Sequence, residues 1–584
     1  MSADPPGAGL KFRHIFVIRL INALTMATFF QPDEYFQSLE PAWTIAFGPE
    51  SGAWKTWEWQ HQLRSSLHPL LFSIPYTIAN AAFNTIQSGG FSPSVRTTML
   101  MAAPAILQAY IAALGDWYSW KLAQQIYGSD SAPSTFTILL QLFSPWQWYC
   151  SSRTFSNSLE TTLCVAALAH WPWQLVGTTP TKENPKVLHA AAITRLRVSL
   201  CLAALAIVLR PTNILIWLTI AFFTLTHLTL RGSSPITFST VTILAREAIL
   251  CGSLVVGASI LADRSFFGFW TFPPYNWLNF NISKSLAVFY GRNPWHYYLF
   301  QGIPLLCTTS LPFVLQALYR PKASTDHQTN TLRILSATVF VTCVTLSLIS
   351  HKEVRFIYPL LPILNVLASP YAASFFTTPP AGPEARRMPR HTNYLLGGIL
   401  VNILLAGYLS YAHQRGPLTV LSYLRGQFEH IHKPSLLHPV PTAPDSELFA
   451  LFLMPCHSTP WRSHLIYPSL NAYALSCDPP LHTEPNTPER DEYRDEADRF
   501  YDNPVPFLSG ELFQTTLASS PRYVVGFEGV EPWLKDFIQT EKGESLGWDL
   551  KPVWSGFNGL FHEDWRRAGK IVVWDTGVYK SDRF

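Results

Sequence analysis

The chain has 584 residues, of which 48% are hydrophobic and only 14% are charged, against about 25% charged residues in ordinary soluble proteins. The net charge of +4 is small and scattered along the chain, which argues against a nucleic-acid partner. The mean hydropathy is only +0.13, because long apolar runs fill residues 11–412 and a more polar stretch follows them. The composition therefore predicts a polytopic α-helical membrane protein with an additional polar domain.

Apolar segments of about 20 residues, the length that crosses a hydrocarbon core of about 30 Å, recur from residue 12 onward. We expect about eleven or twelve membrane segments, some of them re-entrant, in a first domain of residues 1–415. They are predicted near residues 12–30, 66–86, 97–127, 133–150, 156–177, 194–210, 212–230, 243–262, 297–318, 334–350, 355–375 and 393–412.

Clusters of basic residues orient these segments. They lie at 11–14, before the first apolar run, and at 320–333 and 386–390. Because cytosolic loops are enriched in Lys and Arg, we expect all three clusters on the cytosolic side. The loops 31–65 and 263–296 and the polar C-terminal part then face the lumen.

Two adjacent carboxylates, Asp33 and Glu34, follow the first apolar segment directly. A charge at membrane depth costs about 3 kcal/mol unless it is paired or hydrated, so an ionisable group there is a candidate for chemistry. A solvated loop that begins with acids is the alternative. The helix-breaking Pro32 and the aromatic neighbours favour a functional site.

Further stretches expected on the same side of the membrane mix charges with aromatic rings. The first contains Trp57, Trp59 and Arg64; its Trp residues belong either to an interfacial aromatic belt or to a surface that stacks against a sugar ring. The second contains His296 among several aromatic rings. Anchoring at the membrane interface explains the rings but not the presence of this His.

A third stretch, between two apolar segments, places three potential cations within five residues: His351, Lys352 and Arg355. Such a cluster can bind a phosphate, because the Arg guanidinium can donate to two oxygens at once. Basic side chains that snorkel at a membrane boundary are the alternative.

A carboxylate base, cations and aromatic rings on one face of a membrane together suggest glycosyl transfer from a sugar linked to a lipid phosphate. A polytopic lipid or solute transporter is the alternative from another class. It would be expected to show repeated halves and ion pairs buried between its spans. The sequence indicates neither.

Residues 416–584 are predicted to form a mixed α/β domain. Apolar runs predict strands, and polar periodic stretches predict helices: strands at Leu448–Leu453, Tyr523–Gly526 and Ile571–Trp574, and helices at Asp491–Tyr501 and Glu531–Thr540. The acidic run 489–498 is expected to be a solvated helix face with i,i+4 ion pairs rather than a metal site. Cys456 and Cys477 are able to form a disulfide in an oxidising lumen, but their spacing does not decide the pairing.

Seven motifs in chain order carry a family resemblance: QPDEYFQSLE, TWEWQHQLRSSLHPL, SSRTFSNSLE, LRPTN, FPPYNWLNFN, FYGRNPWHYYLFQGIP and SHKEVRFIYPLLP. With them the sequence resembles the dolichyl-phosphate-mannose-dependent mannosyltransferases of glycosyltransferase family 22, membrane enzymes of the GT-C fold. The stretch LFLMPCHSTPWRSHL at 451–465 is similar to that of the branch that acts on the GPI-anchor precursor.

The resemblance implies an inverting α-1,2-mannosyltransferase of the endoplasmic reticulum membrane. It would move mannose from dolichyl phosphate mannose to the second mannose of the GPI-anchor precursor, with its active site facing the lumen. The implied substrates are both lipid-linked, and no cofactor, metal or obligatory protein partner is implied. A related family member that builds the dolichol-linked N-glycan precursor is the alternative, and the stretch at 451–465 argues against it.

By resemblance, Asp33 is the general base of the reaction, with Glu34 as its supporting neighbour. The family usually has His at the position of Gln31. A role for that His in polarising the acid is therefore not available in this chain.

The same resemblance assigns His351, Lys352 and Arg355 to the donor phosphate, with Glu353 orienting these cations. The remaining candidates for binding substrate are Arg64, Trp57, Trp59, Arg153, Glu160, His296, His457 and Arg462.

Overall fold

The computed structural model describes residues 10–86, 93–176, 190–230, 238–283, 289, 291–378, 387–437, 447–484, 487–517, 519–562 and 564–579. Arg386 of the predicted cytosolic clusters and residues 284–288 and 290 of the predicted loop 263–296 lie outside the described residues.

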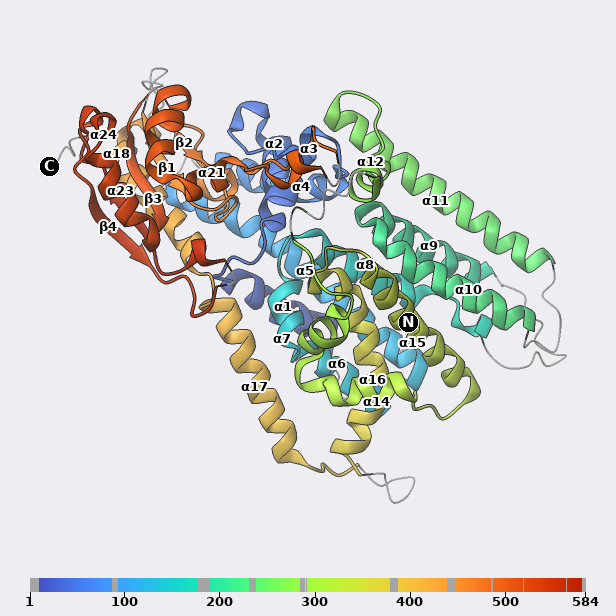
Figure 1. Cartoon of the computed structure of the whole chain (residues 1–584). Coiled ribbons are helices and arrows are strands. Elements are labelled where there is room, and N and C mark those ends of the chain that lie inside the picture. The colour runs from blue at the N-terminus through green and yellow to red at the C-terminus, as the bar shows by residue number, and fades with distance from the viewer. Residues whose placement is uncertain are drawn as a thin grey trace.

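Helices make up the N-terminal domain (Figure 1). They are α1 (Phe12–Thr25), α2 (Glu40–Phe47), α3 (Trp57–Gln60), α4 (Leu67–Ile86), α5 (Pro93–Tyr127), α6 (Ala132–Leu142), α7 (Pro145–Ser151), α8 (Ser156–His170), α9 (Ala190–Leu209), α10 (Ile214–Leu230), α11 (Phe238–Phe267), α12 (Pro273–Leu278), α13 (Ile303–Cys307), α14 (Leu311–Tyr319), α15 (Asp326–Ser347), α16 (Leu361–Phe376) and α17 (Thr392–Tyr411). Two shorter helical turns shape the site described below, η1 (Tyr35–Leu39) and η10 (Val354–Leu360).

Among the described residues, seven helical stretches are long and apolar enough to span a membrane: Ser94–Tyr127, Ala191–Leu209, Val241–Phe267, Tyr298–Tyr319, Asp326–Ser347, Val354–Phe376 and Thr392–His432. Two shorter apolar helices cover Ala132–Leu142 and Pro211–Thr226. The predicted polytopic helical fold is confirmed. The total of eleven or twelve segments stays a prediction, because the other helices are shorter or more polar.

Two predicted segments differ from the structure in their length. The segment 133–150 is divided into α6 and α7, because Ser144 caps α7 by accepting a hydrogen bond from the Gln147 backbone N–H and Pro145 occupies its first turn. The segment 156–177 contains α8, which ends at His170. Its 15 residues extend about 22 Å, and every one of them except His170 is buried.

A buried ion pair joins α1 to α5 and contradicts the expectation that such pairs are lacking between the spans. The Arg19 Nε lies 2.6 Å from the Asp116 Oδ2, and both side chains are fully buried. The Gln147 amide donates to the other Asp116 oxygen at 2.8 Å and accepts from the Tyr358 hydroxyl at 2.7 Å. The pair therefore belongs to a polar network that reaches η10.

The C-terminal domain contains a five-stranded mixed sheet in the order β2-β1-β3-β5-β4. The strands are β1 (Leu448–Leu453), β2 (Ala472–Ala474), β3 (Pro521–Phe527), β4 (Lys551–Gly556) and β5 (Ile571–Asp575). β1 is parallel to β2 and β3, and β5 is antiparallel to β3 and β4. All three predicted strands are confirmed. β2 and β4 were not predicted, because one has only three residues and the other is mostly exposed.

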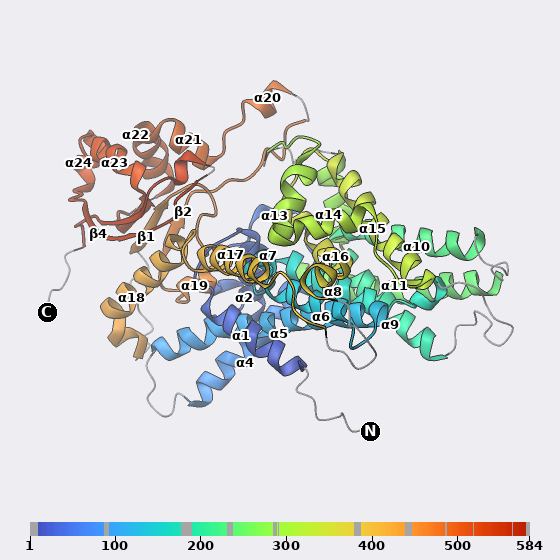
Figure 2. The same ribbon diagram turned by 90° about the horizontal axis from the view of Figure 1, so that it is seen from below.

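Helices cover both faces of this sheet. On one side lies α18 (Gly416–Leu437), which contacts β4, β5 and α5. On the other side lie α21 (Glu496–Asp502), α22 (Pro504–Pro506), α23 (Glu531–Ile538) and α24 (Glu541–Leu546), while α19 (Arg462–Leu465) and α20 (Pro488–Asp491) lie in the long connections. One apolar cluster includes residues of α4, α18 and the sheet, so the two domains share a core. Figure 2 shows α19 next to α2, where the two domains meet.

The predicted helix Asp491–Tyr501 is wrong as a single element. It is divided into α20 and α21, because Asp495 caps α21 by accepting a hydrogen bond from the Asp498 backbone N–H. The expected i,i+4 pairs are replaced by longer-range ones, such as Arg499 with Glu511 at 3.0 Å. Cys456 and Cys477 form a disulfide, which settles the pairing that their spacing left open.

We expect Asp116→Leu to lower the free energy of unfolding of the detergent-solubilised protein by about 3–5 kcal/mol, because it leaves the Arg19 charge buried without its carboxylate partner. The double variant Arg19→Leu/Asp116→Leu should recover most of this loss, since two apolar side chains replace both charges. Size-exclusion chromatography of heated samples measures the effect. Equal stability of the single and double variants would contradict the assignment.

Candidate active site

A cavity of about 1180 Å³ lies in the helical domain, and the C-terminal domain contributes two of its lining residues, His457 and Cys477. Its walls come from the segment 30–37, residues 56–64, the start of α10, the segment 291–301 and the turn 351–356, and His457 and Cys477 complete it. In Figure 1, α2, α3, α12 and the C-terminal domain gather on this side of the helical domain. The predicted lumenal loops therefore meet at one site.

Asp33 lies where the chain turns from α1 into η1. The backbone N–H groups of Tyr35 and Phe36 both donate to the carbonyl of Pro32, so a tight turn begins at that proline. The Asp33 carboxylate is thereby held at the cavity wall, with 16% of its side chain exposed.

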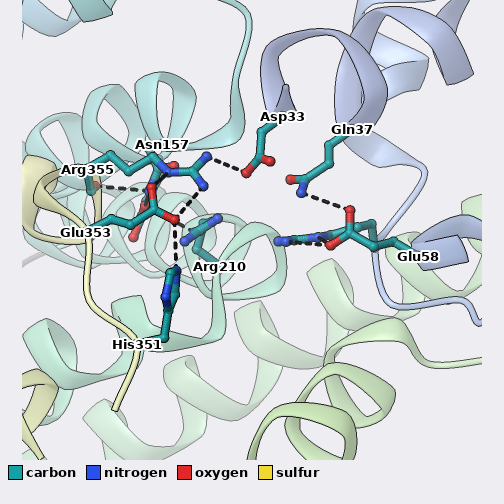
Figure 3. A network of polar contacts seen from close by, with 10 residues as sticks. Asp33, Gln37, Glu58, Asn157, Arg210, His351, Glu353 and Arg355 are labelled. Carbon is teal, nitrogen blue, oxygen red and sulfur yellow. Dashed lines mark hydrogen bonds and ion pairs between the residues drawn. The ribbon is translucent and has the colours of Figure 1, made fainter. Parts of the chain in front are cut away.

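Arg355 joins two carboxylates across this wall (Figure 3). One guanidinium nitrogen contacts Asp33 Oδ2. The Nε and Nη2 atoms donate to the two oxygens of Glu353 at 2.6 and 2.8 Å. This bidentate contact fixes the plane of the guanidinium, so Arg355 presents a defined edge to Asp33.

His351 and Lys352 are held from the neighbouring segment 291–293. The His351 ring lies 3.1 Å from Glu353 Oε1 and 3.2 Å from the Gly291 carbonyl. The Lys352 ammonium donates to the Asn293 carbonyl at 3.0 Å. Burial alone would raise the pKa of Glu353, but Arg355 and His351 outweigh it and hold the pKa well below its usual range. Glu353 is therefore a fixed anion that orients two of the predicted cations.

Glu34 does not line the cavity, and its carboxylate is paired with a buried arginine instead. Its Oε2 lies 3.0 Å from the Nη1 atom of Arg153, a fully buried side chain that also donates to the Thr28 carbonyl at 2.7 Å. Burial raises the pKa of Glu34, although Arg153 opposes this rise. The pair anchors the segment between α1 and η1, so the two adjacent carboxylates do different work.

Arg210 lines the cavity and was given no role from the sequence. Only 6% of Arg210 is exposed. Its Nε atom lies 3.9 Å from Glu160 Oε2, and its guanidinium carbon lies 5.3 Å from the centre of the Phe356 ring. Glu160 itself accepts from Asn213 at 2.9 Å. Arg210 is thus a desolvated cation beside Arg355 (Figure 3), and within the described part of the chain its guanidinium has no hydrogen bond closer than the 3.9 Å contact with Glu160. In the sequence, only its position in the family motif LRPTN pointed to a role for Arg210.

Of the predicted site residues, the structure brings Asp33, His351, Lys352, Arg355, Arg64, Trp57 and His457 to the cavity. The others do not line it: Glu34, Trp59, Arg153, Glu160, His296 and Arg462. The Trp59 indole donates to the Phe36 carbonyl at 2.8 Å. Arg462 donates to the Leu470 and Gly52 carbonyls at 3.1 and 3.3 Å, which ties the C-terminal domain to the loop after α2.

His457 closes the cavity from the C-terminal domain. Its ring lies 4.2 Å from the Phe36 ring, centre to centre, and its Nδ1 lies 3.2 Å from the Cys456 sulfur. Among the described residues, Cys456, His457 and Cys477 have converging ligand atoms. The two sulfurs are bonded to each other, so neither is a thiolate able to hold a metal.

A sequence model of the Alg9-like mannosyltransferase family matches residues 10–466. The chain belongs to this family. The predicted family resemblance is therefore confirmed, and glycosyl transfer is favoured over the transporter alternative.

Curated relatives cover nearly the whole chain. One from Gibberella zeae, named GPI mannosyltransferase 3, is 61% identical over 97% of this chain and 95% of its own length. A relative from Mus musculus, named GPI alpha-1,2-mannosyltransferase 3, is 33% identical over 95% of this chain and 86% of its own. The crystal structure of ArnT from Cupriavidus metallidurans in the apo state has a TM-score of 0.50 at 13% identity and covers 96% of this chain and 97% of that one. This likeness concerns the fold alone.

We expect the thermal stability to fall as the pH is lowered from about 6.5 toward 4. Burial lowers the pKa of His457 to about 4 and that of His464 to about 3. In this pH range the unfolded chain binds protons that the folded chain does not, which destabilises the fold. Melting midpoints at pH 7 and pH 5 should therefore differ less in His457→Gln/His464→Gln than in wild type. An equal difference in both proteins would argue against this assignment.

Proposed function

We propose that this protein is an α-1,2-mannosyltransferase of the endoplasmic reticulum membrane that adds the third mannose of the GPI-anchor core. The donor is dolichyl phosphate mannose, and the acceptor is the GPI precursor that already carries two mannoses. The cavity with Asp33 facing a cluster of cations is the observation that supports this proposal most. The names of the full-length relatives support the acceptor class over the dolichol-linked N-glycan precursor.

Asp33 is the general base in this proposal. Its carboxylate takes the proton from the 2-hydroxyl of the second mannose as that oxygen attacks C1 of the donor mannose. The bond between C1 and the phosphate oxygen breaks, and its electrons leave with dolichyl phosphate. A single displacement of this kind inverts the configuration at C1.

Arg355 and Arg210 neutralise the charge that develops on the departing phosphate. Cations that are already fixed and partly desolvated stabilise such charge better than mobile ones, because they need no reorganisation during the reaction. Arg355 is fixed by Glu353, and Arg210 is held among Glu160, Phe356 and the start of α10. His351 and Lys352 add positive potential from the same turn.

The same cavity offers apolar surface to a lipid chain. Leu215, Leu305, Leu346 and Ile349 line it on the side of the membrane helices. His457 and Cys477 line it from the C-terminal domain, which we place in the lumen with the active site. We propose that catalysis proceeds without a metal, a cofactor or an obligatory protein partner.

Asp33→Asn should lower the rate of mannose transfer by about 10²–10⁴-fold, because Asn cannot accept the proton. Microsomes that contain the variant are incubated with labelled dolichyl phosphate mannose and dimannosyl GPI precursor, and the product is separated by chromatography. Glu34→Gln is the matched control, and its effect should be much smaller, since Glu34 does not line the cavity. Retained activity of Asp33→Asn would move the base elsewhere.

Arg210→Gln should reduce transfer by about 10²-fold or more, because it removes a preorganised positive charge from the leaving phosphate. Arg210→Lys restores the charge but not the planar fork, so it should recover only part of the rate. The rate at saturating acceptor, measured over a range of donor concentrations, tests both variants. Wild-type rates in Arg210→Gln would exclude Arg210 from donor binding.

A further inference from the structure

A polar wall faces the cation cluster across the cavity. The Glu58 carboxylate accepts from the Arg64 Nη2 at 3.0 Å and from the Gln37 amide at 2.9 Å. Thr56 and Trp57 continue this wall, and all five residues line the cavity. Figure 3 shows Gln37 and Glu58 on the side opposite Glu353 and His351, with Arg210 between the two groups.

Two atoms of this wall are buried and have no hydrogen-bond partner among the described residues. They are the Oε1 atom of Gln37 and the hydroxyl of Thr56, and their residues are only 8% and 5% exposed. Unsatisfied buried polar atoms are costly and are usually satisfied by a ligand or a water. One acceptor and one hydroxyl that can donate or accept match the hydrogen bonds of sugar hydroxyls.

The position of Gln37 relates the wall to the reaction. Gln37 lies within η1, four residues after Asp33, so the two side chains lie about one helical turn apart. A group held by Gln37 is therefore a neighbour of the atom that Asp33 deprotonates. The donor phosphate, by contrast, belongs with Arg355 and Arg210.

We infer that Gln37, Thr56 and Glu58 form the subsite that recognises the ring hydroxyls of the acceptor mannose. This inference rests on the proposed function. Gln37 Oε1 accepts from one hydroxyl, the Thr56 hydroxyl bonds to another, and Glu58 accepts further hydrogen bonds on oxygens that Arg64 and Gln37 hold in place. The buried Trp57 ring adds an aromatic surface to the wall. Its centroid lies 6.5 Å from that of the Phe280 ring.

The test measures the KM of the acceptor and of the donor separately for Thr56→Val and Glu58→Gln, two substitutions that preserve shape. Each should raise the KM of dimannosyl GPI precursor by about tenfold, the size of one lost hydrogen bond, and leave the KM of dolichyl phosphate mannose unchanged. Thr44→Val is the matched control, because Thr44 is also buried but bonds within α2 and lies outside the cavity. It should leave both constants at their wild-type values.

A second experiment uses acceptors that lack one ring hydroxyl of the second mannose. Wild type should transfer more slowly to the deoxy compound that loses its bond to Thr56, and Thr56→Val should be insensitive to that change. Wild type that transfers nothing to the dimannosyl acceptor would overturn the proposed function itself. Active wild type with unchanged acceptor KM in both variants, or with a raised donor KM instead, would overturn only the subsite.

Discussion

The site depends on one cation that two carboxylates share. Arg355 contacts Asp33, which lies 322 residues earlier in the chain, and is held in its plane by Glu353. The backbone carbonyl of Arg355 also accepts a hydrogen bond from Asn157 on α8 at 3.1 Å. Helix α8 is buried almost throughout, so the turn that carries Arg355 rests on a firmly enclosed helix.

Buried charges elsewhere hold the framework around this contact. Arg153 and Glu34 tie the segment before η1 to the helix that precedes α8, and Arg19 with Asp116 ties α1 to α5. Desolvating such pairs is unfavourable in itself, and apolar replacements are often at least as stable. We infer that these pairs fix the geometry of the site. The pair of Arg19 and Asp116 is linked through Gln147 and Tyr358 to the turn that carries Arg355.

Sequence patterns predicted the helical membrane fold, the three apolar strands and the placement of Asp33 and Arg355 on the same face of the membrane. They did so because long apolar runs and charges beside them have few alternatives in a membrane. Other features depend on tertiary packing and were not predictable. Asp33 and Glu34 are equivalent as neighbours in sequence, and only the position of Arg153 makes one of them structural. Likewise, Arg19 lies inside an apolar run and gives no sign of its partner.

The C-terminal domain contributes to the candidate site. His457 and Cys477 line the cavity, and the Ser463 backbone N–H donates to Glu40 at the start of α2, at 2.8 Å. The disulfide between Cys456 and Cys477 joins the two connections that contribute these residues. His457 packs against Phe36, the residue next to Gln37, so the C-terminal domain touches the segment that carries the polar wall. In the proposed reaction, a cavity whose two walls differ in this way, with cations on one side and hydrogen-bonding groups on the other, would separate the charged leaving group from the neutral mannose of the acceptor.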